Sequence, residues 1–166
     1  MNTLKLSAVT VMIVAGSLTG CAQRPLATIP TDTTVMIQTN TAPEAIYEAA
    51  VQCVLDNVNP PSSGQLFTYQ SEKNSQLAFV YHDRAAYMLL GNPQSNEFKA
   101  TIRINGKKGE IKSQGIQWFQ TPSQYVTGGW QDPHMLHNQE YVDNMYSAVN
   151  DMKNKLNTCI TQYASS

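Results

Sequence analysis

The sequence predicts an α+β fold: a two-layer sandwich in which an antiparallel sheet of about four strands is covered by an N-terminal and a C-terminal helix. Helical periodicity marks only the two ends of residues 41–166, and strand-forming segments lie between them. The order helix, strands, helix is typical of this architecture. In addition, Cys53 and Cys159 each fall on the apolar stripe of one expected helix, so a bond between them would hold the two helices side by side over the sheet.

The first twenty residues have the order of an export signal. Lys5 gives a short positive start, and residues 6–15 form an apolar stretch too short to span a bilayer. Leu18-Thr19-Gly20-Cys21 then resembles the lipobox of bacterial lipoproteins. The resemblance implies that the Cys21 thiol receives a diacylglyceryl group, that residues 1–20 are removed, and that the new amino group is acylated, with palmitate as a typical chain. An ordinary secretory signal with an incidental cysteine is the alternative.

Lipidation at Cys21 would anchor the protein to a membrane, because each buried methylene contributes about 0.8 kcal/mol. Ala22 stands where enteric bacteria use aspartate to retain lipoproteins in the inner membrane. The resemblance therefore implies an outer-membrane protein that faces the periplasm. Residues 21–40 are expected to be a flexible tether, since Pro25, Pro30 and several threonines break any periodicity. Only residues 35–37 have the composition of a short strand.

The composition limits the class of partner and the redox state. Eleven Lys and Arg oppose twelve Asp and Glu, and Lys5 belongs to the signal. This near-neutral balance argues against a nucleic-acid-binding protein. With Cys21 assigned to lipid, Cys53 and Cys159 form an even pair in an exported chain, which favours a disulfide. Two buried free thiols are the alternative, and neither cysteine has the CxxC spacing of a zinc site.

The first helix begins at a predicted capping box, Thr41-Ala42-Pro43-Glu44. Apolar residues then follow at helical spacing, and the Asn59–Gly64 segment, which contains two prolines, ends the helix. The residues of the stripe are Ile46, Ala49, Ala50, Cys53 and Val54.

Four strands are expected next. The strand-forming segments are residues 66–69, 77–81, 98–104 and 110–119. Residues 72–75 and Asn105-Gly106 are the turns that join them in pairs. The apolar positions change parity across Gly115, which predicts a bulge there. Residues 85–90 are too apolar for a loop and too short for a helix, so they stay unassigned.

Residues 120–137 are expected to be a long loop, and the last helix covers residues 138–163. Val142, Met145, Val149, Met152, Leu156, Cys159 and Tyr163 form its three-four stripe. In element order, residues 41–166 are similar to bacterial envelope proteins with a TATA-binding-protein-like domain. This resemblance implies a fold and no activity.

Two features carry the hypothesis of a binding surface. Five basic residues concentrate in one hairpin, where they could meet an anionic envelope polymer: Lys99, Arg103, Lys107, Lys108 and Lys112. Aromatic residues, above all Tyr125 and Trp130, lie in or beside the long loop, a common place for partner contacts. The alternatives are a solvated charged face and aromatic side chains that fold back to cover the sheet.

The remaining candidates are histidines. His134 and His137 are spaced to share a face and could bind zinc, although no third ligand is specified. His82-Asp83 is interpreted as a turn. No nucleophile motif and no phosphate-binding loop occurs, and no cofactor is expected.

The leading hypothesis is therefore a lipid-anchored, non-enzymatic binding or assembly module for an envelope protein or anionic polymer. The alternatives are a carrier of small apolar ligands or lipid, and a metal-dependent enzyme that uses His134 and His137.

Overall fold

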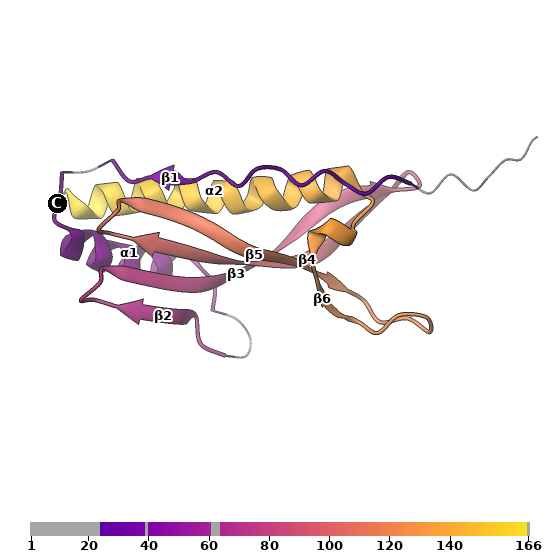
Figure 1. Ribbon diagram of the computed structural model, residues 1–166, viewed down its shortest axis with the longest axis horizontal. Helices are drawn as coiled ribbons and strands as arrows, with labels where there is room; N and C mark the ends of the chain where they lie inside the picture. The colour runs from indigo at the N-terminus through magenta and orange to yellow at the C-terminus, as the bar shows by residue number, and fades with distance from the viewer. Residues whose placement is uncertain (1–23, 39, 61–63, 166) are drawn as a thin grey trace, which may run out of the picture.

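The computed structural model describes residues 24–38, 40–60 and 64–165, and it confirms the α+β class (Figure 1). A six-stranded antiparallel sheet packs with one face against two helices. Lys5 and the Leu18–Cys21 segment that resembles a lipobox lie outside the described residues. The elements, in chain order, are β1 (Val35–Met36), α1 (Pro43–Asn57), β2 (Phe67–Ser71), β3 (Gln76–Leu89), β4 (Asn92–Asn105), β5 (Glu110–Gln120), β6 (Gly129–Gln131), the 3₁₀ helix η1 (Pro133–Met135) and α2 (Gln139–Ala164).

The sheet has the strand order β1-β5-β4-β3-β2. β6 pairs with the same edge of β5 as β1 does, but at the opposite end of that strand. The sheet therefore has two short strands more than the four expected in succession. β1 lies where the composition of residues 35–37 suited a short strand, whereas β6, with three residues, is too short to show alternation. Residues 85–90, which the sequence leaves unassigned, complete β3 and enter a tight turn at Leu90 and Gly91, both with positive φ. Apolar residues on both faces of β3 near this turn conceal the strand pattern.

The bulge at Gly115 is confirmed. The register between β4 and β5 shifts between Lys99 and Thr101, whose partners are Gln117 and Gln114. Gly115 has φ +61°, a conformation that costs a residue with a Cβ more than glycine. Because of the extra residue, Ile111 and Ile116 both face the helices although their numbers differ in parity.

Helix α1 has the predicted extent, but the predicted capping box is wrong. The N-cap is Ala42, and no side chain caps the first turn. Thr41 instead donates its hydroxyl hydrogen bond to the carbonyl of Ala164 at the end of α2, 2.9 Å away. This tertiary contact joins the start of one helix to the end of the other, so it replaces the local cap.

The core lies between the helices and the sheet. Phe79, Phe98 and Ile102 from the sheet are fully buried against Val54 of α1 and Met145 of α2. The predicted disulfide between Cys53 and Cys159 is present, with Cα atoms 5.9 Å apart, and it joins α1 to α2. Within the part of the chain that the structure describes, no helix combines the length and the apolar composition that crossing a bilayer requires.

The stretch expected to be a flexible tether is instead attached to the domain over residues 24–38, which we call the N-terminal arm. The arm runs extended along the whole of α2, in the opposite direction (Figure 1). Near its start the Ala27 amide donates to Leu136 O at 2.7 Å, and at its end β1 pairs with β5 and Ile37 is buried. Prolines and threonines have no periodicity but suit an extended chain whose backbone finds partners elsewhere.

Lys153 fixes the middle of the arm to α2. Its side chain is fully buried on the apolar face of the helix, and its ammonium group lies 2.6 Å from Asp32 Oδ1. It also donates to the carbonyl of Thr33. Ser113 of β5 donates to the same Asp32 oxygen at 2.7 Å, so the arm, the helix and the sheet meet at one carboxylate.

Candidate functional site

The face of the sheet that the helices leave uncovered, which we call the open face, brings together most of the predicted binding residues. In the β4–β5 register Arg103 stands opposite Lys112, and Lys99 opposite Gln117, so all four side chains share this face. The set from the three central strands is Gln76, Ala78, Val80, His82 and Arg84 of β3, Glu97, Lys99, Thr101 and Arg103 of β4, and Lys112, Gln114, Gln117 and Phe119 of β5.

An aromatic and cationic cluster occupies one half of the open face. Trp130 of β6 pairs with Phe119, and their rings meet edge to face with centroids 5.3 Å apart. The indole also reaches His82 of β3, 5.7 Å away, and Lys99, whose Nζ lies 4.4 Å from the ring centroid. The cation and the edge-on rings hold Trp130 as a partly exposed platform.

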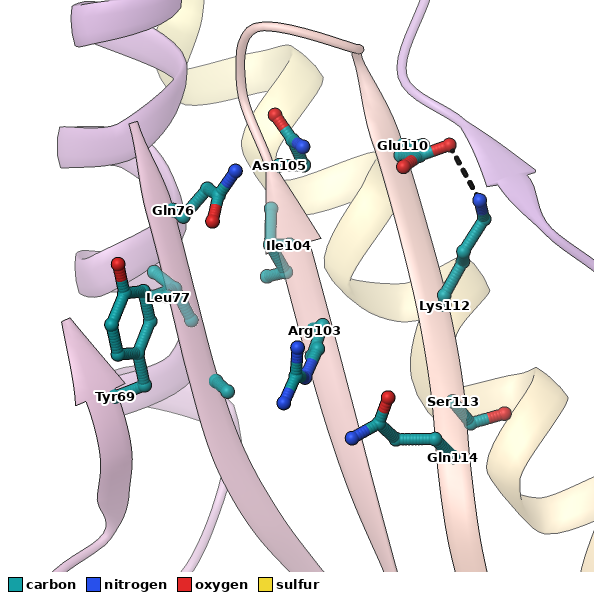
Figure 2. A pocket seen from close by; sticks show the side chains of 11 residues that line it. Tyr69, Gln76, Leu77, Arg103, Ile104, Asn105, Glu110, Lys112, Ser113 and Gln114 are labelled. Carbon is teal, nitrogen blue, oxygen red and sulfur yellow. Dashed lines mark ion pairs between the residues drawn. The ribbon is translucent and has the colours of Figure 1, made fainter. Parts of the chain in front are cut away.

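Arg103 lies in a shallow groove of about 290 Å³ on the other half of this face (Figure 2). Tyr69 of β2 stands on one side of the groove and Gln114 of β5 on the other. The small Ala78 also lines it. With its amide carbonyl turned toward the guanidinium group, Gln114 accepts from Arg103 Nε at 3.1 Å and from the terminal nitrogen at 3.2 Å. The guanidinium group is exposed and keeps donors available for a carboxylate or phosphate.

The other three basic residues of the predicted set are engaged with nearby partners. Lys112 Nζ pairs with Glu110 at 2.9 Å, and Lys108 reaches the same carboxylate at 3.9 Å. Lys107 donates to the carbonyl of Lys73 in the neighbouring turn. Lys99 and Arg103 are therefore the cations that the open face offers to an anion at its centre.

Tyr125 does not join this cluster. It lies 87% exposed in the loop between β5 and β6, whereas Trp130 belongs to β6 itself. The expected loop of residues 120–137 thus shortens to residues 121–128, because β6 and η1 occupy its second half. The aromatic residues of this region separate into a platform on the sheet and a loop tip.

His82 is a member of the site that sequence reasoning assigned to a turn. In the structure β3 continues through His82 to Leu89, and His82 stands opposite Lys99. Partial burial and the neighbouring Lys99 charge lower the pKa of His82, and the Glu97 carboxylate partly opposes this shift. The imidazole is therefore neutral at neutral pH and gains charge only in mildly acidic conditions.

The proposed metal ligands have separate partners. His137 Nδ1 lies 3.1 Å from the carbonyl of Pro25 in the N-terminal arm, and His134 Nε2 lies 3.8 Å from Asp132. Among the described residues, no group of three or more His, Cys, Asp or Glu is arranged to hold a metal ion. His137 has a structural contact with the arm that its spacing to His134 does not reveal.

A second cavity, of about 440 Å³, lies on the helix side of the sheet at the start of α2. The strands contribute Tyr87, Leu89 and Trp118 to its lining. Leu136, which precedes α2, and Tyr141 of α2 line its other side. Burial raises the pKa of Tyr141, whose hydroxyl donates to the carbonyl of Glu97. This cavity is where the domain could hold a small apolar molecule.

The comparisons with known proteins support the fold. No protein-family model matches the chain, and no curated protein sequence matches it. Among solved structures, the chain is similar to a DUF4468 family protein from Bacteroides ovatus ATCC 8483, with TM-score 0.57, 9% identity and coverage of 78% of this chain and 84% of that one. It is also similar to a TBP-like protein from Parabacteroides distasonis ATCC 8503, with TM-score 0.53, 12% identity and coverage of 78% and 90%. At these identities the likeness shows a shared architecture, in agreement with the resemblance of element order.

Proposed function

We propose that this chain is a lipid-anchored protein of the bacterial cell envelope that binds an anionic envelope partner on the open face of its sheet. The observation that carries the binding role is the Trp130 platform, held by Phe119, His82 and Lys99 on the same face of the sheet as the exposed Arg103. Exposed aromatic and arginine side chains that are held in place by neighbours are typical anchors of protein interfaces. The partner is an envelope protein segment or polymer that carries carboxylate or phosphate groups.

The envelope location rests on the sequence and on the redox state. The Leu18–Cys21 motif resembles a lipobox, and the Cys53–Cys159 disulfide suits an oxidising compartment. The test is mass spectrometry of the N-terminal peptide from protein purified out of its own membranes. We expect a chain that begins at Cys21 and carries acyl groups, in the outer-membrane fraction of a density gradient. A free Cys21 thiol or a different first residue would refute the anchor.

The binding role is tested by photo-cross-linking in the cell. A photoreactive amino acid at Gln117, between the platform and Arg103, should capture a discrete partner. The same group at Asn154, on the exposed side of α2, should not. Equal capture from both positions would show that the open face has no specific partner.

Binding affinity for the captured partner, measured in variants, then distinguishes the contribution of the two cations from that of the Trp130 platform. The pair of changes Lys99→Gln and Arg103→Gln should weaken binding at least tenfold, which corresponds to about 1.4 kcal/mol, with a steep salt dependence lost at the same time. Trp130→Ala should cost about 2 kcal/mol in binding free energy. Lys155→Gln, the same change of charge on an exposed part of α2, is the control and should have no effect.

A carrier of small apolar ligands is the second candidate, and the cavity beside Leu89 and Trp118 favours it. Native mass spectrometry of the protein released gently from membranes would reveal a co-purified lipid or apolar molecule. Its loss in a Leu136→Trp variant, which fills the cavity, would assign the molecule to this site. Protein of bare mass in repeated preparations would refute the carrier function.

A further inference from the structure

The two ends of the domain differ in charge. The β2–β3 and β4–β5 turns lie at one end and contain Glu72, Lys73, Lys107 and Lys108. The β3–β4 turn and the β5–β6 loop lie at the opposite end (Figure 1). Neither residues 85–96 nor residues 113–131, which form those two connections and their flanks, contain a charged residue or a histidine. We call this second end the uncharged end.

Large apolar side chains are exposed at the uncharged end. Leu90, at the tip of the β3–β4 hairpin, is 83% exposed, and its neighbours Met88 and Leu89 are 49% and 44% exposed. Tyr125 and Val126 are exposed at the tip of the neighbouring loop. Large apolar side chains are also exposed elsewhere, for example at Met36 and Leu55. Met88–Leu90 differ because three in succession are exposed at one hairpin tip, which marks a surface that contacts something apolar.

The N-terminal arm begins at the same end. Arg24 and Leu89 line the same cavity, and Figure 1 shows the first described residues of the arm beside the β3–β4 turn. Only three residue steps separate Arg24 from Cys21, and an extended chain spans at most about 3.6 Å per residue. The connection from Arg24 to Cys21 can therefore span at most about 11 Å.

We propose that the uncharged end is a membrane-contact surface and that the Met88–Leu90 hairpin tip enters the interfacial region of the bilayer beside the acylated N-terminus. This inference rests on the lipid anchor of the proposed function. An acylated Cys21 lies at the membrane interface, so an arm fixed to α2 brings the tip to the same depth. The apolar tip then supplies a second membrane contact beside the acyl chains.

The polar groups around the tip agree with this placement. The carboxylate of Glu140 accepts from the Met88 amide at 2.8 Å, and the carboxylate of Asp132 accepts from the His134 amide. Each carboxylate thus accepts one backbone hydrogen bond and otherwise stays exposed to water. Arg24 lines the same cavity as Leu89 and can meet lipid phosphate. A protein partner at the tip would have to fit into the short space that the three-residue connection leaves above the bilayer.

The test measures the depth of the tip in the lipidated full-length protein. Leu90→Cys is labelled with an environment-sensitive fluorophore and reconstituted in phosphatidylethanolamine–phosphatidylglycerol vesicles that contain a nitroxide-labelled lipid. Lys73→Cys, in the exposed β2–β3 turn at the opposite end of the domain (the charged end), is the matched control. Cys53 and Cys159 are protected by their disulfide, and the unsubstituted protein measures any background labelling. We expect a blue shift and loss of fluorescence at position 90 and neither change at position 73.

The outcomes separate the tip from the anchor, because the mass of the N-terminal peptide reports acylation independently. Acylated protein whose Leu90→Cys probe is not quenched by the nitroxide lipid overturns the membrane-contact surface and leaves the anchor intact. A probe shielded from aqueous iodide but not quenched by the nitroxide lipid would place a protein at the tip, and also overturns it. A quenched probe in protein without acyl groups would support the tip and refute the anchor.

Discussion

The contact between Lys153 and Asp32 should decide whether the N-terminal arm stays on the domain. Asp32→Ala removes the carboxylate 2.6 Å from a fully buried ammonium group and leaves the Thr33 carbonyl as its acceptor. Breaking a buried ion pair by removing one partner costs about 3–5 kcal/mol. Asp32 keeps 33% of its side chain in water, so we expect the lower value, about 3 kcal/mol.

The reverse change should cost less. Lys153→Met keeps a side chain of similar length in the apolar interface and removes the buried charge. Asp32 can then rehydrate and retains the Ser113 hydroxyl, so we expect about 1 kcal/mol. The double variant should resemble Lys153→Met, which gives a coupling energy of about 3 kcal/mol in a double-mutant cycle.

Urea unfolding of the three variants gives the free energies, and hydrogen exchange of residues 24–38 shows where the loss occurs. Because detachment of the arm alone would expose Lys153 to water, the free energy of that detachment is the upper limit of the cost. Asp32→Ala should therefore accelerate exchange of the arm amides more than of the β3 and β4 amides. Unchanged exchange in the arm, or a larger loss for Lys153→Met than for Asp32→Ala, would refute the reasoning.

Three further predictions concern the disulfide, the open face and the bulge. Replacing Cys53 and Cys159 by alanine should lower the free energy of unfolding by about 2–5 kcal/mol, since their separation of 106 residues closes a long loop; an unchanged urea midpoint would contradict this. NMR titration should give His82 a pKa below its usual range, and affinity for an anionic partner should rise as the pH falls through that pKa. Replacing His82 by glutamine should abolish this dependence, and a pKa above the usual range would contradict the role of burial and Lys99. Gly115→Ala should cost about 1 kcal/mol in thermal unfolding, because φ is +61° while the space for a Cβ is free; a loss several times larger would indicate a steric clash.

The sequence was sufficient for features that depend on local periodicity. Alternation along β4 predicted its buried residues, and the cysteines on both helical stripes predicted their bond. The three-four stripe of α2 was right for residues such as Met145 and Leu156, but Tyr163 is 52% exposed and Ile160, outside the stripe, is fully buried. The stripe failed at Lys153, which is fully buried on the same face of α2. A lysine can occupy that position because its partner, Asp32, arrives from 121 residues away in the arm, and no periodicity encodes that contact.

The open face shows the same division. The basic residues of the β4–β5 hairpin were visible in the sequence, because a hairpin places its residues by counting. The platform was not, since Trp130 lies in a strand of three residues and its ring reaches over β5 to Lys99 and His82. Which lysines remain available was also hidden, because Glu110 engages two of them through geometry that the turn determines.

The arm gives the open face a defined orientation if Cys21 is acylated. It is attached along α2, whose 26 residues extend about 39 Å at 1.5 Å per residue. An anchor at one end of this rod would hold the long axis of the domain away from the membrane, with the charged end about 40 Å from the bilayer. The strands run along the same axis (Figure 1), so the open face would lie parallel to the bilayer normal and would not rest on the lipid. A partner could then approach Trp130 and Arg103 from the side. Because β6 lies toward the uncharged end and Arg103 toward the opposite end, the partner would meet the Trp130 platform near the membrane and the guanidinium group farther from it.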